Sequence, residues 1–289
     1  KPDQIILIDY PGLNLYIAKK LKKKFRIPIT YYISPQIWAW KGKRLKNIKS
    51  YIDQMIVFFP FEKIWYAKRN VLVECVGYPY KKLNIEKSIL KKNMGINPDY
   101  PLLTIFPGSR QQELDYHLKT CLNAAKIIKN KIPNLQIIVG LSNSMDYNDL
   151  PINQHIKIEQ ENSLCALQAA DFAIIASGTA TLQATIFRIP HIIIYKTDSI
   201  FYLFARFMIK TKFIGLPNII ANKMIVPELI QSKMNLKNIV NYMFKMVSDS
   251  SWKNKMKDEL DKVCTSLGDG NASTKAAKKI INFISYEKV

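Results

Sequence analysis

Apolar runs rich in β-branched residues alternate with amphipathic stretches along almost all of the 289 residues. In the first part of the chain, the apolar runs fall at 4–9, 28–34, 54–59 and 71–77. Between them, helical periodicity marks the segments 14–25, 42–52 and 61–69. Strands that alternate with helices are typical of βαβ units around a parallel sheet. This pattern predicts an α/β fold.

A second alternating series follows the polar, lysine-rich stretch 80–99. We expect strands at 102–109, 135–141, 156–160, 172–177 and 191–196. We expect helices near 111–130, 163–170, 179–187 and 271–285, and a polar loop that extends to about 154. The predicted domains are residues 1–84, residues 85–265, and a C-terminal helix within 266–289. Two doubly wound, Rossmann-like domains of this kind would place a ligand cleft between the carboxyl ends of their strands.

Asp9 ends the first predicted strand and is followed by a Tyr-Pro-Gly turn. The turn would leave its carboxylate at the carboxyl edge of the sheet, where it can act as a general base toward a hydroxyl group. The alternative role for Asp9 is to cap the loop that follows.

Two strand-to-helix turns in the second domain carry small residues that suit a phosphate. In the segment 107–110, Pro-Gly-Ser-Arg, Ser109 could cap the helix and Arg110 offers a bidentate donor. In the segment 176–179, Ala-Ser-Gly-Thr, the glycine lets an anion approach the amino end of a helix. The alternative for the second turn is an ordinary helix cap.

Three further segments carry candidate binding residues. Trp38 and Trp40 precede a basic helix, so they suit a lipid interface, a sugar or an RNA base, or they pack under the sheet rim. The segment 201–210, FYLFARFMIK, is either a membrane contact or a buried amphipathic helix. Asn218 and Glu228 follow it, and the alternative for them is a surface loop and an ordinary helix with Glu228 exposed.

The net charge of +21 comes from 43 basic and 22 acidic side chains. It indicates a polyanionic partner, such as nucleic acid, an anionic membrane or a phosphorylated substrate. Only six of the basic residues are arginine, and Ile and Asn are abundant, as in proteins of AT-rich genomes. Part of the charge can therefore reflect mutational bias.

No metal or redox motif is present in the sequence. The four cysteines form no CxxC pair, so we expect reduced, buried thiols in a cytosolic protein. His117, His155 and His191 show no metal-ligand spacing, and neither GxGxxG nor a P-loop pattern occurs. We predict no metal and no cofactor.

Seven separated motifs, taken in order, resemble the lipid-A-disaccharide synthase family over nearly the whole chain. They are IDYPGLN (8–14), YYISPQIWAWKGKRLKNIK (31–49), FPFE (59–62), VGYP (76–79), FPGSRQQE (106–113), ASGTATLQA (176–184) and LPNIIANKMIVPELIQ (216–231). The resemblance implies an inverting glycosyltransferase of GT-B type, with two Rossmann-like domains facing a cleft. Its substrates would be UDP-2,3-diacylglucosamine and 2,3-diacylglucosamine 1-phosphate, and its products UDP and the lipid A disaccharide 1-phosphate.

The resemblance also implies roles for particular residues. Asp9 would be the general base on the acceptor 6-hydroxyl, and Arg110 would offset charge on the departing UDP. The nucleotide site would comprise Gly108, Ser109, Arg110, Ser177, Gly178, Thr179, Gln183, Asn218 and Glu228. Contacts with the acceptor or the membrane would come from Trp38, Trp40, Lys41, Arg44, Phe204, Arg206 and Phe207.

Three departures from the family pattern stand out. Gly12 occupies a position where many members have aspartate, and Gln183 stands where a glutamate often binds the nucleotide ribose. The family's Gly-Glu-Ala-Ser-Gly-Asp loop is absent, so we expect the first domain to be incomplete and the 289 residues to be part of a longer enzyme.

The resemblance implies a peripheral protein on the cytoplasmic face of the inner membrane, with no nucleic-acid partner. It leaves a homodimer open, because some members exchange C-terminal segments. The alternatives are another GT-B UDP-sugar enzyme, such as a UDP-sugar 2-epimerase, and a basic RNA-binding protein.

Overall fold

The structure, a computed structural model, describes residues 2–80, 84–143, 145 and 156–287. Most of the predicted polar loop that extends to about 154, and His155, lie outside this range. Contacts divide the chain into two compact units. Unit 1 comprises Lys1–Lys81, Ala205–Thr211 and Thr265–Val289, and unit 2 comprises Lys82–Phe204 and Lys212–Cys264. The predicted domain limits at 84 and 265 stay predictions.

Unit 1 is built on a parallel sheet in the order β1-β2-β3-β4. The strands are β1 (Ile5–Ile8), β2 (Ile29–Tyr32), β3 (Gln54–Val57) and β4 (Glu74–Cys75). The connections contain α1 (Pro11–Lys24), the 3-10 turn η1 (Gly42–Arg44), α2 (Leu45–Tyr51) and α3 (Pro60–Ala67). Proline at the first position of α1 and three lysines in its last turn match the ordinary preferences of helix ends.

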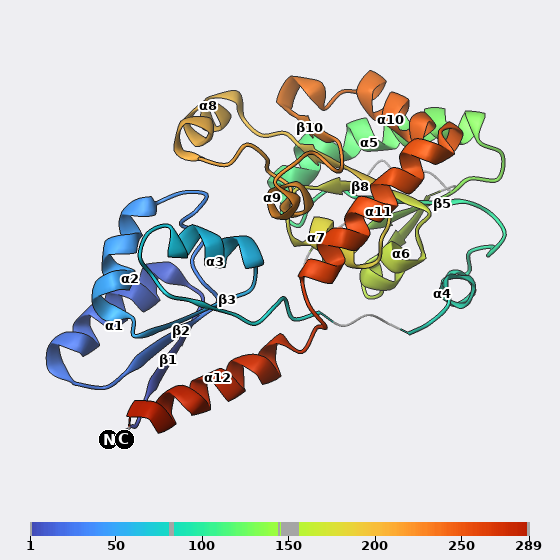
Figure 1. The fold of residues 1–289 in the computed structure, drawn as a ribbon. Helices are drawn as coiled ribbons and strands as arrows, with labels where there is room; N and C mark the ends of the chain where they lie inside the picture. The colour runs from blue at the N-terminus through green and yellow to red at the C-terminus, as the bar shows by residue number, and fades with distance from the viewer. Residues whose placement is uncertain (1, 81–83, 144, 146–155, 288–289) are drawn as a thin grey trace. The chain divides into compact units, whose positions relative to one another are not determined.

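The last helix of the chain, α12 (Ala272–Glu287), belongs to unit 1. Its Lys279 lies beside the sheet, because the ammonium group pairs with Glu74 of β4 at 2.8 Å. The Lys279 carbonyl also accepts a hydrogen bond of 3.2 Å from Gln54 of β3. The helix therefore runs alongside this sheet, as the red ribbon of Figure 1 shows.

Unit 2 holds a six-stranded parallel sheet in the order β10-β9-β8-β5-β6-β7. Its strands are β5 (Leu102–Phe106), β6 (Gln136–Gly140), β7 (Ile156–Glu159), β8 (Phe172–Ala176), β9 (His191–Tyr195) and β10 (Glu228–Ile230). The chain builds outward from β5 through β6 to β7, and then returns to add β8 on the other side of β5. The strand order therefore reverses between β5 and β8.

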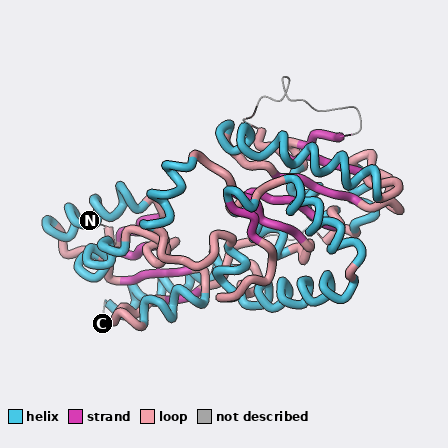
Figure 2. The backbone as a smooth tube through the Cα atoms, turned by 90° about the horizontal axis from the view of Figure 1, so that it is seen from above, coloured by secondary structure: helices cyan, strands magenta, loops and turns pink. Residues whose placement is uncertain are grey.

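Helices cover both faces of this larger sheet, as Figure 2 shows. They are α4 (Lys87–Asn93), α5 (Gln111–Lys131), α6 (Ser163–Ala169), α7 (Thr179–Ile186), α9 (Leu216–Ala221), α10 (Leu236–Ser248) and α11 (Ser250–Ser266), with a 3-10 turn η2 (Gln231–Lys233). Alternate residues of β5 belong to different cores: Leu103 and Ile105 pack with α5, and Leu102 packs with α4. The continuous apolar run of β5 is the signature of a strand buried on both faces.

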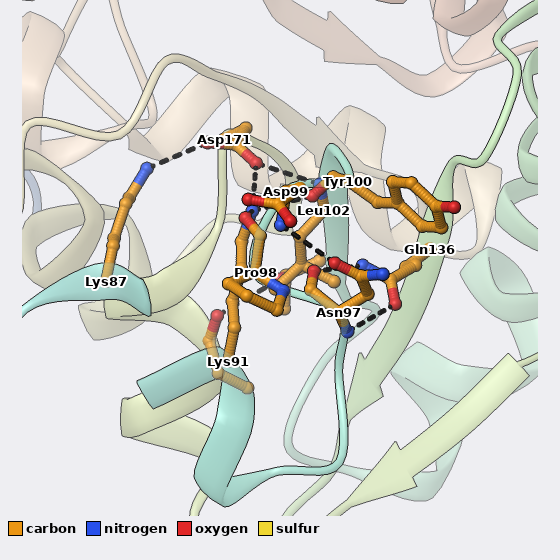
Figure 3. Close-up of polar contacts among 11 residues, drawn as sticks. Lys87, Lys91, Asn97, Pro98, Asp99, Tyr100, Leu102, Gln136 and Asp171 are labelled. Atoms are coloured by element: carbon orange, nitrogen blue, oxygen red, sulfur yellow. Dashed lines mark hydrogen bonds and ion pairs between the residues drawn. The ribbon is translucent and has the colours of Figure 1, made fainter. Parts of the chain in front are cut away.

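The polar stretch 80–99, predicted only as a separator, contains helix α4. The buried ammonium group of Lys91 fixes this helix to the sheet (Figure 3). It donates to the carbonyl of Tyr100 at 2.7 Å and pairs with the Asp171 carboxylate at 2.9 Å. Asp171 also accepts the N–H of Leu102 at 2.9 Å. A lysine that is buried with full pairing gives no apolar signal, so the periodicity of the sequence does not reveal its helix.

All four cysteines are free. The prediction of buried thiols holds for Cys121 and Cys264, whereas Cys75 and Cys165 are half-buried. Among the described residues, no group of His, Cys, Asp and Glu is arranged to hold a metal ion.

Candidate active site

The first functional turn of unit 2, Pro107–Arg110, follows β5 directly. Gly108 adopts a φ of +140°, and a Cβ at this position would lie 2.4 Å from the Cβ of Glu113. The Glu113 carboxylate accepts the N–H of Ser109 at 2.7 Å. Glu113, and not Ser109, therefore stabilises the start of α5, and the expected capping by the Ser109 side chain is wrong because Arg110 is the N-cap residue.

Arg110 points its guanidinium group toward solvent. Its side chain is 81% exposed, and its ion pair with Glu113 is loose, at 3.7 Å. An exposed arginine held at the amino end of a helix has most of its N–H donors free for an anion.

His117 holds this turn in place from within α5. The ring is fully buried and lies between the carbonyl of Pro107 and the backbone N–H of Lys196, which donates to Nε2 at 2.8 Å. Because Nε2 accepts, Nδ1 carries the proton and donates to Pro107. The sequence shows no metal-ligand spacing around His117, and in the structure its ring joins the turn after β5 to the end of β9.

The second functional turn, Ser177–Thr179, follows β8. Ser177 is fixed by two bonds, because its N–H donates to Ile194 at 3.0 Å and its hydroxyl donates to Ile214 at 3.1 Å. Gly178 and Thr179 are exposed, and a Cβ added to Gly178 would meet no atom within 4 Å. The space beside the first turn of α7 is therefore open to a ligand.

The sheet topology brings these two turns together. β5 and β8 are hydrogen-bonded neighbours, with Phe106 paired to Ile175 at their carboxyl ends. In open α/β sheets, ligands bind outside the carboxyl ends of strands where the strand order reverses. Both turns lie at that point of unit 2, and both offer backbone N–H groups at a helix start.

Asn218 and Glu228 form a buried network behind these turns. The Asn218 amide donates to Val226 at 2.9 Å and to Glu228 at 2.8 Å, and its oxygen accepts the N–H groups of Ile225 and Val226. Glu228 accepts the N–H groups of Ile214 and Gly215. Glu228 lies buried in β10, so the alternative of an exposed helical residue is wrong. The pair shapes the segment 214–226, to which the Ser177 hydroxyl binds.

Gln183 lies on α7, one turn beyond Thr179. It is half-buried, and its amide makes no hydrogen bond to another residue within the described ranges. Its amide therefore remains available to a ligand bound at this edge of the sheet.

In unit 1, Asp9 follows β1 in a backbone conformation that several groups hold. Asp9 and Tyr10 both adopt left-handed φ values, 46° and 41°, which are uncommon for residues other than glycine. The Asp9 N–H donates to Tyr32 at 2.9 Å, and its carbonyl accepts from the Tyr31 hydroxyl and from the Asn14 amide at 2.7 Å. Asn14 also donates to Ile8 at 2.9 Å.

The Asp9 carboxylate itself is exposed and joins no hydrogen bond or ion pair with any residue that the structure describes. Burial and, to a lesser extent, the Asp9 charge raise the pKa of the Tyr31 phenol, and the Arg44 charge lowers it. A fixed backbone with a free carboxylate is the arrangement a general base needs.

Trp38 and Trp40 follow β2 but differ in environment. Trp38 is buried, and its indole N–H donates to Glu62 at 3.1 Å. Burial raises the pKa of Glu62 to about 7, although the N–H groups of Phe59, Trp38 and Phe58 act to lower it. Trp40 is 41% exposed, with the Lys41 ammonium 4.4 Å from the centre of its ring.

Helix α8 (Ser199–Met208) exposes an unusual amount of apolar surface. Phe204 is 67% exposed and Phe207 is 83% exposed, and no residue of the helix is buried. The interpretation of this segment as a buried amphipathic helix is therefore wrong. Among the described residues, no helix is both long and apolar enough to cross a membrane.

A family model described as lipid-A-disaccharide synthetase matches residues 1–281. The chain belongs to the lipid-A-disaccharide synthetase family. It is 40% identical over 280 residues to lipid-A-disaccharide synthase 1 of Legionella pneumophila (strain Paris), covering 94% of this chain and 73% of the relative. It is 35% identical over 288 residues to the lipid-A-disaccharide synthase of Coxiella burnetii (strain CbuG_Q212), covering 98% of this chain and 76% of the relative.

Solved structures confirm that the chain has the GT-B fold. The UDP-GlcNAc 2-epimerase of Neisseria meningitidis bound to UDP-GlcNAc matches with a TM-score of 0.64 at 12% identity, over 97% of this chain and 76% of that one. The calicheamicin glycosyltransferase CalG4 matches with a TM-score of 0.60 at 13% identity, over 99% of this chain and 76% of that one. Family and fold confirm a glycosyltransferase in the synthesis of the lipid A disaccharide.

Proposed function

We propose that the chain transfers 2,3-diacylglucosamine from UDP-2,3-diacylglucosamine to 2,3-diacylglucosamine 1-phosphate, with inversion at the sugar carbon. The observation that carries this proposal is the pair of phosphate-favouring turns at the reversal point of the unit 2 sheet, after β5 and β8. Membership of the lipid-A-disaccharide synthetase family supports the choice of substrates.

The donor site is proposed for unit 2. Ser177, Gly178 and Thr179 would bind the diphosphate through N–H groups at the start of α7, and Gly108, Ser109 and Arg110 would complete the site. Arg110 would offset the negative charge that grows on UDP as the bond from the sugar breaks. Gln183 would accept a hydrogen bond from a ribose hydroxyl, and Asn218 and Glu228 would hold the segment beside the nucleotide.

The acceptor chemistry is proposed for unit 1. The acceptor 6-hydroxyl oxygen would attack C1 of the donor sugar from the face opposite UDP. Its proton would pass to the Asp9 carboxylate as the bond between C1 and the diphosphate oxygen breaks, and the bonding electrons would leave with UDP. One glycosidic bond forms, and the bond from C1 of the donor sugar to the diphosphate oxygen breaks. Asp9 then releases its proton to solvent.

The membrane contact is proposed for α8, with Phe204, Arg206 and Phe207 at its centre. Both substrates carry acyl chains, so an enzyme that uses them must reach a lipid surface. Exposed aromatic side chains beside basic ones suit the interface of an anionic bilayer, here the cytoplasmic face of the inner membrane. Trp38, Trp40, Lys41 and Arg44 are further proposed contacts with the acceptor or the lipid surface.

The reaction is tested with the full gene product that contains this chain, supplied with both proposed substrates in detergent. We expect UDP and disaccharide 1-phosphate in equal amounts from the wild type. Asp9→Asn should lower kcat about 10²- to 10⁴-fold while UDP affinity stays unchanged, because general base catalysis contributes about this much. Arg110→Ala should lower both kcat and the affinity for UDP, because it removes charge complementary to the diphosphate.

Two exposed residues offer matched controls: Asp258→Asn on α11 and Arg26→Ala after α1 remove the same charges elsewhere and should leave kcat unchanged. Disaccharide formation by Asp9→Asn at the wild-type rate would exclude Asp9 as the base. Folded wild type that binds UDP but makes no disaccharide would contradict the proposed substrates. Interconversion of UDP-sugars in the same assay would instead indicate a 2-epimerase.

A further inference from the structure

Unit 1 contains a pocket of about 400 Å³, and among the residues that line it the proposed function uses only Trp38. It lies among the segment after β2, helix α3 and the residue two positions beyond α8. Its lining consists of Ile37, Trp38, Gly42, Leu45, Trp65, Arg69 and Lys210. The volume falls in the range of small-ligand sites.

The pocket is positively charged and has no internal counter-ion. The Arg69 guanidinium lies 3.8 Å above the Trp65 ring and donates one N–H to the Trp65 carbonyl at 2.9 Å, which leaves its other donors free. The backbone N–H of Lys210 donates to Ala39 at 2.9 Å. Within the described residues, its ammonium group has neither a hydrogen-bond nor an ion-pair partner, and no lining residue is acidic.

The rest of the lining favours an occupant with few hydroxyl groups. Apart from Arg69 and Lys210, the lining side chains are aliphatic or aromatic, with none of Ser, Thr, Asn, Gln, Asp or Glu. The indole N–H of Trp38 is already bound to Glu62. Apart from the two exposed cations, the lining side chains therefore offer a hexose no hydrogen-bond partners. The lining instead fits a phosphate joined to a short apolar segment.

The chain around Lys210 points to the source of that phosphate. Lys210 lies two residues beyond α8, whose Phe207 is 83% exposed, and no acidic residue occurs from 199 to 227. We propose that the pocket binds the phosphate headgroup of an anionic glycerophospholipid such as phosphatidylglycerol. The inference rests on the proposed contact of α8 with the membrane and gives that contact a preference for one headgroup class.

The first test compares binding of the chain to vesicles of phosphatidylcholine alone and with roughly one-fifth phosphatidylglycerol. Arg69→Ala/Lys210→Ala removes the two pocket cations, and Lys24→Ala/Arg26→Ala removes the same charge from the exposed end of α1. We expect the pocket variant to lose at least about fivefold more of the phosphatidylglycerol-dependent affinity than the control. Equal losses would overturn the proposal, because they would indicate general attraction of a basic protein.

The second test uses a soluble ligand that needs no bilayer. Monomeric dihexanoyl phosphatidylglycerol should change the fluorescence of Trp38 and Trp65 saturably in the wild type. The signal should be lost in the Arg69→Ala/Lys210→Ala variant and kept in Phe204→Ser/Phe207→Ser. Stronger binding of inorganic phosphate or glucosamine 1-phosphate than of the lipid monomer would overturn the proposal.

The vesicle assay of Phe204→Ser/Phe207→Ser separates the two proposals. Unchanged binding of this variant to both kinds of vesicle would exclude α8 as the membrane contact, while the monomer titration would still report on the pocket. Circular dichroism and UDP binding establish that each variant is folded.

Discussion

Asn14 holds the turn that carries the proposed base, Asp9. Its amide donates to the carbonyls of Ile8 and Asp9 and so holds the left-handed turn between β1 and α1. We expect Asn14→Ala to lower kcat about 10- to 100-fold with little change in KM for either substrate, because a misplaced base slows the chemical step. Steady-state kinetics of the full gene product measure this.

Asn254→Ala, an exposed asparagine on α11, is the matched control and should be silent. A role in stability alone would appear as a lower melting temperature with normal kcat in the folded fraction. That outcome would contradict the positioning role of Asn14.

Residues at strand ends are predictable from the sequence when their chemistry is visible there. Arg110 and Gly108 stand out because a turn, a cation and a helix start coincide. The roles of Glu113 and His117 are not predictable in this way, because each depends on a contact with the backbone of a turn that only the fold brings near. The same holds for Asn218 and Glu228: the motif indicates these residues, but their hydrogen-bond partners appear only in the structure.

At the scale of elements, the alternating apolar pattern predicted nearly every strand of both sheets and their parallel class. It did so because buried parallel strands are continuous apolar runs between amphipathic helices. It missed α4, since the buried face of that helix includes a lysine, and it predicted neither strand β10 nor the helices α9, α10 and α11. In α4, the buried charge of Lys91 conceals the helical period.

The ion pair that anchors α4 gives a prediction at this scale. Burial acts to raise the pKa of Asp171, but Lys87, Lys91 and the Leu102 N–H together hold it below its usual value. Asp171→Asn leaves the buried Lys91 ammonium without a counter-ion and should lower the free energy of unfolding by about 2 kcal/mol near pH 7. This is less than a fully buried pair would lose, because the Asp171 side chain is 35% exposed.

The pH dependence of this difference follows from the lowered pKa. A depressed native pKa contributes stability that is complete above the unfolded value, near 3.9, and is lost as the pH falls through the native value. The difference between wild type and Asp171→Asn should therefore be constant above about pH 5 and shrink below about pH 4. Denaturant unfolding at several pH values measures it, with Asp258→Asn as control; a difference independent of pH would contradict the ion-pair account.

At the scale of the whole molecule, the net charge of +21 does not by itself choose between RNA and a membrane. Lysines are spread over helices of both units, including the last turn of α1 and the segment after α8. Spread charge attracts any polyanion at low salt, and only a second feature gives a preference. The exposed apolar face of α8 is such a feature, because its aliphatic and aromatic side chains gain more from an acyl layer than from RNA.

Varying the salt concentration should separate the attraction of the basic charge from the burial of the apolar face of α8. Between about 50 and 300 mM NaCl, we expect affinity for a single-stranded RNA to fall by about 10²-fold or more, because counterion release drives that binding. Binding to vesicles that contain phosphatidylglycerol should fall at first and then reach a plateau, because burial of Phe204 and Phe207 is not screened. Phe204→Ser/Phe207→Ser should abolish the plateau and leave the steep salt dependence of RNA binding. RNA binding that persists at high salt and competes with UDP would instead favour a nucleic-acid function, since it would require base or sugar contacts within the nucleotide site.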